Sequence, residues 1–137
     1  MDGYIRAIMA RVYKDYKAYC YFALNRLVSE LGVDLYQFNL ESKLDEILSD
    51  PPTVSKEEIK HEIRSNHFMT NKVIEKLEED GLIEVDKVDG KYQIRITREG
   101  ILYARKYNRF FLSIYREQIR DHYRYGGVPH WAREAEK

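Results

Sequence analysis

The chain has 137 residues, and its 23 lysines and arginines balance 23 aspartates and glutamates, so the formal net charge is zero. This length holds either one domain with a sizeable core or a small domain with long helical arms, and we expect the second arrangement. Because the charges balance, the chain as a whole does not attract nucleic acid, and any basic surface must be local.

The first predicted element is a long helix over residues 4–31, where apolar side chains recur at helical spacing and no proline occurs. Gly32 follows as a typical helix end. A shorter helix is predicted over residues 39–50, which Pro51 and Pro52 terminate. We interpret residues 1–52 as an N-terminal helical arm. Its apolar positions are Ile5, Ile8, Val12, Tyr16, Tyr19, Ala23, Leu27 and Leu31 in the first helix, and Leu40, Leu44, Ile47 and Leu48 in the second.

Two short helices with a tight connection are predicted next. Ser55 and Glu58 form a capping box, in which each side chain satisfies a backbone amide, so a helix is expected from Lys56 to about Arg64. Asn66 is a good N-cap for the following helix. Such a pair makes a helix-turn-helix. The apolar positions of the two helices are Ile59, Ile63, Val73, Ile74 and Leu77.

A β-hairpin is predicted after the second helix, which Gly81 ends. The segment "LIEV" begins a strand, and Asp89-Gly90 is a strong signal for a two-residue turn because both residues adopt positive φ readily. In the return strand "KYQIRIT", alternation places one set of side chains on one face and the other set on the opposite face. The first set is Tyr92, Ile94 and Ile96, and the second is Lys91, Gln93 and Arg95. We interpret this hairpin as a wing.

The run "VIEKLEEDGLIEV", the hairpin and "ITREG" at the start of a further helix resemble the winged helix-turn-helix of MarR-like transcriptional regulators. The resemblance covers residues 53–104. It implies an α+β, mainly α fold: a winged helix-turn-helix over residues 53–100 with long N- and C-terminal dimerisation helices. The wing departs from the family's longer, arginine-rich tip, because here a tight Asp-Gly turn is flanked by Lys87 and Lys91.

The predicted recognition helix is half acidic, yet its acids Glu75, Glu78, Glu79 and Asp80 lie at the C-terminal end. In helix-turn-helix docking the N-terminal turns meet the base edges and the far end points back into the protein. The resemblance places His67, Phe68, Asn71 and Lys72 at base-facing positions. The expected DNA-binding residues are His67, Phe68, Thr70, Asn71, Lys72 and Lys76 on this helix, and Lys56, Arg64, Lys87, Lys91 and Arg95 on the wing and flank.

The C-terminal region, residues 101–137, is predicted to be one long helix followed by a tail in which Trp131 is the anchor. Its aromatic band is too wide for a helix that covers one small domain, so a second surface must cover it. Interleaved aromatics and arginines also suit stacking on single-stranded nucleic acid, but helical spacing favours a homodimer interface. The expected interface residues are Tyr107, Phe110, Phe111, Ile114, Tyr115 and Ile119.

Catalysis is not expected, because the chain has no nucleophile elbow, phosphate-binding glycine loop or paired cysteine motif. His61 and His67 are six residues apart instead of four, so they cannot share a helix face as zinc ligands. We expect no metal and no cofactor. The resemblance implies room for a small-molecule effector between the dimer helices and the DNA-binding lobes, but no residue set identifies one.

The single Cys20 cannot form an intramolecular disulfide and is expected to be a buried structural thiol in a reducing compartment. No signal peptide and no apolar run of ~18 residues is present, so a cytoplasmic protein without membrane contact is expected. The sequence therefore predicts a homodimer that binds double-stranded DNA and regulates transcription. Its preferred DNA site is expected to be an inverted repeat. The alternative is a winged-helix protein-interaction module without direct DNA binding.

Overall fold

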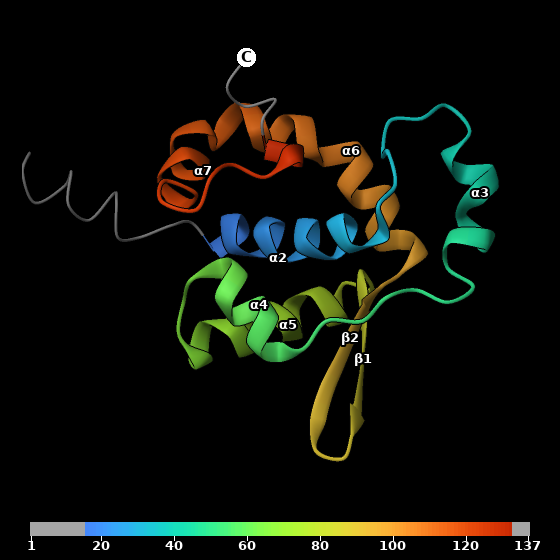
Figure 1. The fold of residues 1–137 in the computed structure, drawn as a ribbon, viewed down its shortest axis with the longest axis horizontal. Helices are drawn as coiled ribbons and strands as arrows, with labels where there is room; N and C mark the ends of the chain where they lie inside the picture. The colour runs from blue at the N-terminus through green and yellow to red at the C-terminus, as the bar shows by residue number, and fades with distance from the viewer. Residues whose placement is uncertain (1–15, 133–137) are drawn as a thin grey trace, which may run out of the picture.

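The computed structural model describes residues 16–132, and the predicted helical positions Ile5, Ile8 and Val12 lie outside them. The described part is α+β and mainly helical, with a two-stranded antiparallel sheet (Figure 1). This content is compatible with a winged helix. The elements are α2 (Tyr16–Leu31), α3 (Leu40–Ile47), α4 (Lys56–Ile63), α5 (His67–Glu79), β1 (Ile83–Val88), β2 (Lys91–Ile96), α6 (Arg98–Ile114) and α7 (Arg116–His122).

Helix α2 is the centre of the molecule. It lies between α6 and α7 on one side and α4, α5 and the base of the hairpin on the other (Figure 1). Its side chains Ala18, Phe22 and Leu27 are almost completely buried, and they belong to the same apolar core as Ile59 of α4 and Ile101 of α6. The predicted boundaries near residues 52 and 100 therefore do not separate independent cores.

Helices α4 and α5 begin where their caps predict. The Ser55 hydroxyl accepts a hydrogen bond from the backbone N–H of Glu58 at 3.0 Å, and Asn66 Oδ1 accepts one from the N–H of Met69 at 2.8 Å. Arg64 ends α4 in the left-handed conformation, with φ of 51°, so the two helices are joined by a short turn. Both predicted N-caps are confirmed.

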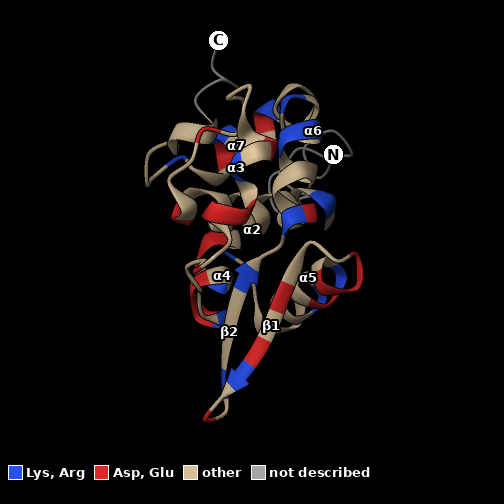
Figure 2. Ribbon diagram, turned by 90° about the vertical axis from the view of Figure 1, so that its right-hand side faces the viewer, with Lys and Arg blue, Asp and Glu red and all other residues tan. Residues whose placement is uncertain are grey.

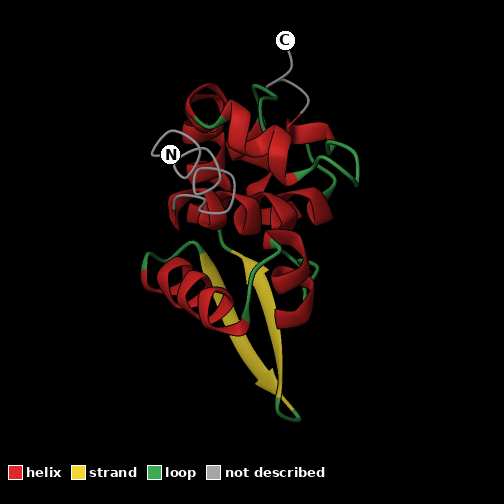
Figure 3. Ribbon diagram, turned by 90° about the vertical axis from the view of Figure 1, so that its left-hand side faces the viewer, coloured by secondary structure: helices red, strands yellow, loops and turns green. Residues whose placement is uncertain are grey.

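The hairpin has the predicted turn and alternation. Asp89 and Gly90 both have positive φ, and β1 pairs with β2 in a regular antiparallel register. Ile94 and Ile96, which share a face as predicted, are buried, while the end of the hairpin extends beyond the helices (Figure 3). An unpredicted bridge covers the other edge of β2, because Val54 and Ile94 exchange backbone hydrogen bonds of 2.8 and 2.9 Å.

The motif "ITREG" has a structural explanation. The Thr97 hydroxyl accepts a hydrogen bond from the N–H of Gly100 at 3.0 Å and donates one to the carbonyl of Gly81 at 2.6 Å. A Cβ on Gly100 would lie 2.2 Å from the backbone oxygen of Leu82 and 2.7 Å from a side-chain carbon of Ile96. The threonine therefore caps α6 and ties it to the start of β1, and the glycine lets the two approach.

The prediction of one long C-terminal helix is wrong, because the helix breaks at Tyr115 and continues as α7. The break lets the second half fold back over α2 (Figure 1). There the His122 ring stacks on Phe22, with ring centroids 4.0 Å apart and planes 12° apart, and Tyr123 meets Phe22 edge to face. Burial of this aromatic cluster offsets the loss of helix continuity.

Candidate nucleic-acid interface

The exposed face of α5 changes character along the helix. His67, Phe68 and Lys72 are exposed in its first turns, and Asn71 is half-buried, whereas the acidic side chains occupy the last turns. Figure 2 shows acidic residues at one end of α5 and along β1. The first turns of α5 therefore carry no carboxylate that would repel a polyanion.

Thr70 does not belong to that exposed face, which corrects its prediction as a DNA-binding residue. Its side chain is fully buried, and its hydroxyl donates a hydrogen bond of 2.9 Å to the carbonyl of Asn66. The residue lies on the same side of α5 as Val73, Ile74 and Leu77, which pack in the core. Thr70 therefore supports the N-terminal turn of α5.

The two lysines of α5 have partners within the protein. The Lys72 ammonium lies 4.7 Å from the centroid of the Tyr16 ring, and the Tyr16 hydroxyl donates to the Lys72 carbonyl at 2.9 Å. Burial, with Cys20 nearby, raises the pKa of Tyr16 to about 12. Lys76 forms an ion pair with Asp80 at 3.2 Å, which raises the pKa of its ammonium. Both lysines are exposed, so neither contact prevents them from reaching another group.

A row of basic groups runs from the hairpin to the start of α5. The Tyr92 ring lies beneath two ammonium groups, with Lys87 5.1 Å and Lys56 5.3 Å from its centroid. Lys60 lies one turn beyond Lys56 on α4, and its ammonium donates to Nε2 of His67 at 3.1 Å. We name Lys87, Lys56, Lys60 and His67 the basic row. Residues far apart in the sequence are thereby gathered from three elements, β1, α4 and α5.

Three other basic residues that were predicted to contact DNA, Lys91, Arg95 and Arg64, do not belong to the basic row. Lys91 is exposed at the end of the hairpin, but it lies on the opposite face from Lys87 and Tyr92. The guanidinium of Arg95 bonds to Asp86 at 2.7 Å and to Glu84 at 2.9 Å, and these two carboxylates raise its pKa. Arg95 is therefore neutralised within the hairpin, which does not support its prediction as a phosphate contact.

Arg64 is likewise a structural residue. Its guanidinium donates to the carbonyl of His122 and lies 5.9 Å from the centroid of the Tyr123 ring. These contacts hold the end of α4 against the end of α7. The sequence did not signal this role, because the two segments are distant in the chain and meet only after α7 has folded back.

The predicted dimer residues divide into two groups. Phe110 and Ile114 are 61% and 60% exposed on α6, and Tyr107 beside them is half-buried. We name these three residues the apolar stripe. Phe111 and Ile119 are fully buried in the single chain, so their prediction as interface residues is corrected. The Phe111 ring stacks on Tyr21 at 4.2 Å, and the Tyr115 ring lies 5.2 Å from Phe111.

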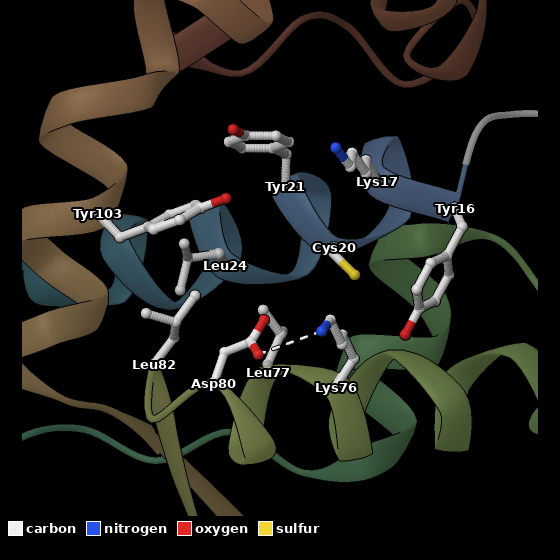
Figure 4. A pocket seen from close by; sticks show the side chains of 10 residues that line it. All are labelled: Tyr16, Lys17, Cys20, Tyr21, Leu24, Lys76, Leu77, Asp80, Leu82 and Tyr103. Carbon is white, nitrogen blue, oxygen red and sulfur yellow. Dashed lines mark hydrogen bonds and ion pairs between the residues drawn. The ribbon is translucent and has the colours of Figure 1, made fainter.

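A pocket of about 310 Å³, which the sequence analysis did not locate, lies between α2, the second half of α5 and α6 (Figure 4). Tyrosine rings and leucines make up most of its wall, and Cys20, half-buried, lies on it. The Lys76–Asp80 ion pair lies along one side (Figure 4). Its lining is Tyr16, Lys17, Cys20, Tyr21, Leu24, Lys76, Leu77, Asp80, Leu82 and Tyr103.

Within residues 16–132, no group of three or more histidine, cysteine, aspartate or glutamate side chains is placed to hold a metal ion. No helix in the same range is long and apolar enough to cross a membrane. Comparison with protein-family models, with curated proteins and with solved structures finds no match to this chain.

Proposed function

We propose that this protein is a sequence-specific, double-stranded DNA-binding protein of the MarR-like winged helix-turn-helix type, which acts as a homodimeric transcriptional regulator. In this proposal α4 and α5 are the helix-turn-helix, α5 is the recognition helix, and the β1–β2 hairpin is the wing. The observation that carries the proposal is the basic row, which leads from the hairpin to the N-terminal turn of α5.

The polarity of α5 supports the same orientation. A recognition helix enters the major groove with its N-terminal residues toward the bases, and the free N–H groups there favour an anionic partner. In this orientation Asn71 would face the bases, where an asparagine can pair with adenine, and the basic row would contact phosphates on the flanking backbone. The acids of the last turns then lie on the side away from the DNA, where they add little repulsion.

The apolar stripe supports the dimer. An exposed phenylalanine and isoleucine one turn apart on a helix are typical of an interface with a second copy of the chain. A twofold axis at α6 would present two α5 helices to successive major grooves, about one helical turn of DNA apart. The preferred site would then be an inverted repeat.

One observation favours the alternative, a winged-helix module that binds a protein. Carboxylates cover the second half of α5 and surround Arg95, so the surface is less basic than most DNA-binding faces. A basic peptide segment would suit this acidic side. The two functions differ in whether the protein binds naked duplex.

Electrophoretic mobility shift with a randomised duplex pool, at low and moderate salt, tests the proposal. We expect binding that weakens steeply with salt, because lysine contacts release counterions from the phosphates. The double variant Lys56→Ala/Lys87→Ala should weaken binding to all duplexes about equally and reduce the salt slope by about one unit per contact. Lys43→Ala, an exposed lysine on α3, serves as the matched control and should bind normally.

Sequence selectivity is tested separately with Asn71→Ala. This variant should relax the base preference at one position in each half-site, at a cost of roughly 1–3 kcal/mol for the preferred duplex. Absence of binding by the unmodified protein at low salt, across the whole pool, would refute DNA binding and support the protein-interaction module.

A further inference from the structure

Phe68 presents a large apolar group at the position where the proposed recognition helix begins. Its side chain is 75% exposed in the first turn of α5, whereas the other large apolar side chains of that helix are at least half covered by the core. Within residues 16–132 it makes no ring contact with another aromatic side chain. Covering a solvent-exposed phenyl ring with an apolar group of a partner removes apolar surface from water and therefore stabilises the complex.

The exposed side chains next to Phe68 are polar, and two of them make contacts within the protein. His67 is bonded to Lys60, and since an ammonium can only donate, the ring nitrogen Nε2 is the acceptor. Lys72, four residues along, is drawn to the Tyr16 ring. Asn71, three residues along, shares the exposed face with Phe68. The face therefore offers one apolar contact beside one amide that can both donate and accept.

The major groove of DNA has one apolar group with which such a ring can pair. Thymine carries a methyl group at C5, and none of the other three bases has a methyl group on that edge. We propose that Phe68 contacts the 5-methyl group of a thymine, next to the base pair that Asn71 meets, and so makes that methyl group a determinant of the half-site. This inference rests on the proposed DNA-binding function.

Uracil substitution tests it, because replacing thymine by uracil removes the methyl group and keeps the base pair. Each thymine of a selected duplex is replaced in turn, in both half-sites together, and dissociation constants are measured by fluorescence anisotropy. For the unmodified protein, one position should weaken binding roughly fourfold per half-site, the factor for burying one methyl-sized group. At that position 5-methylcytosine, paired with guanine, should bind more tightly than unmodified cytosine.

The variant Phe68→Ala should bind the thymine and uracil duplexes equally, since it has no ring to cover the methyl group. Phe38→Ala is the matched control, because Phe38 is 95% exposed in the loop between α2 and α3, and it should keep the full uracil effect. Both residues are on the surface, so neither change should unfold the chain.

The outcomes separate the two proposals. If the unmodified protein binds the selected duplex but no uracil position weakens it, Phe68 does not contact a methyl group, although DNA binding stands. The same conclusion follows if Phe68→Ala retains the uracil effect. If the unmodified protein binds no duplex, both the proposed function and this inference are overturned.

Discussion

Asn25 of α2 and Asn108 of α6 are fully buried amides that satisfy each other. Each side-chain nitrogen donates to the other residue's side-chain oxygen, at 3.0 and 2.7 Å, and Asn25 also donates to the carbonyl of Tyr21 at 2.9 Å. Because the pair is buried, sliding α2 along α6 would break both hydrogen bonds between the two amides and leave their polar groups only partly satisfied. The pair therefore helps to fix the register of the two helices.

Asn108→Ala should lower the free energy of unfolding by about 1–3 kcal/mol, because the amide of Asn25 then stays buried with part of its hydrogen bonding lost. Urea denaturation monitored by circular dichroism measures the change. The double variant Asn25→Leu/Asn108→Leu, which removes both amides, should lose less stability than the two single Leu variants added together. Simple additivity would show that the two amides do not act as a pair.

Glu62 of α4 has a half-buried carboxyl group and lies next to the aromatic cluster. Its backbone carbonyl accepts a hydrogen bond from the His122 ring at 2.6 Å. Burial raises the pKa of its carboxyl above the ordinary value of 4.5, and the charges of Arg26, Arg64 and His61 offset this only in part. Since the folded pKa is the higher one, the carboxyl contributes stability in its protonated form. That contribution is complete below the unfolded pKa and is lost as pH rises through the folded pKa.

Glu62→Gln, which is neutral at every pH, should therefore be more stable than the unmodified protein at pH 7. The difference in free energy of unfolding should shrink toward zero as pH falls to about 4. Urea denaturation at pH 4, 5, 6 and 7 measures it. Glu46→Gln, an exposed carboxyl on α3, is the control and should change stability by no more than about 0.5 kcal/mol at any pH. A constant difference between the Glu62 variant and the parent at all four pH values would contradict the burial argument.

At the scale of elements, the junction between the hairpin and α6 depends on close backbone approach. The Thr97 hydroxyl bridges Gly81 and Gly100, and the missing side chain of Gly100 makes room for the Leu82 carbonyl. The hairpin is thereby anchored at its base, while its end is held through the Lys56–Tyr92–Lys87 contact. This anchoring fixes the direction of the proposed wing relative to α4.

Gly100→Ala should lower the free energy of unfolding by roughly 1–3 kcal/mol, because a methyl group 2.2 Å from a backbone oxygen forces α6 away from β1. Ala is the better helix former, so helix propensity alone predicts the opposite sign. Thermal and urea denaturation distinguish destabilisation by the steric clash from stabilisation by the higher helix propensity of alanine. Ser113→Ala, at an exposed position of the same helix, should have little effect or stabilise slightly. A stabilised Gly100 variant would show that the junction tolerates a side chain.

At the scale of the whole molecule, the folding of α7 onto α2 decides which aromatic residues remain for a partner. Phe111 packs inside one chain, against Tyr21 on one side and near Trp131 on the other. Phe110, the next residue in the sequence, points outward. The area available for a dimer is therefore the apolar stripe of Tyr107, Phe110 and Ile114, narrower than the predicted band.

Light scattering at micromolar concentration should give a mass of about twice 16.4 kDa for the unmodified protein. The double variant Phe110→Asp/Ile114→Asp should be a folded monomer, because both side chains are exposed in the single chain and charges there oppose association. Its helical circular dichroism should be unchanged, and its binding to an inverted repeat should fall to the level of a single half-site.

Phe111→Asp is the contrasting variant. A buried carboxylate without a partner disrupts the core, so this change should unfold the chain and not merely separate two copies. A monomeric mass for the unmodified protein would refute both the homodimer and the inverted repeat as its preferred site.

Local signals were sufficient for much of the fold. The caps at Ser55 and Asn66 and the Asp89-Gly90 turn act within a few residues, so the sequence alone located α4, α5 and the hairpin. The position of the acids on α5 was also evident, since helical spacing assigns them to its last turns. The family resemblance and the DNA-binding function remain predictions.

The tertiary structure decided what depends on distant segments. Three predicted DNA-binding side chains are committed to the fold by contacts that local patterns do not show. Thr70 is buried, Arg95 is ion-paired across the hairpin, and Arg64 donates a hydrogen bond to the carbonyl of His122. The basic row exists because α4 packs against β2 and α5, which no local pattern specifies. The break at Tyr115 follows from the stability gained when His122 and Tyr123 pack on Phe22, and pairing over about 100 residues of chain cannot be inferred from helical periodicity.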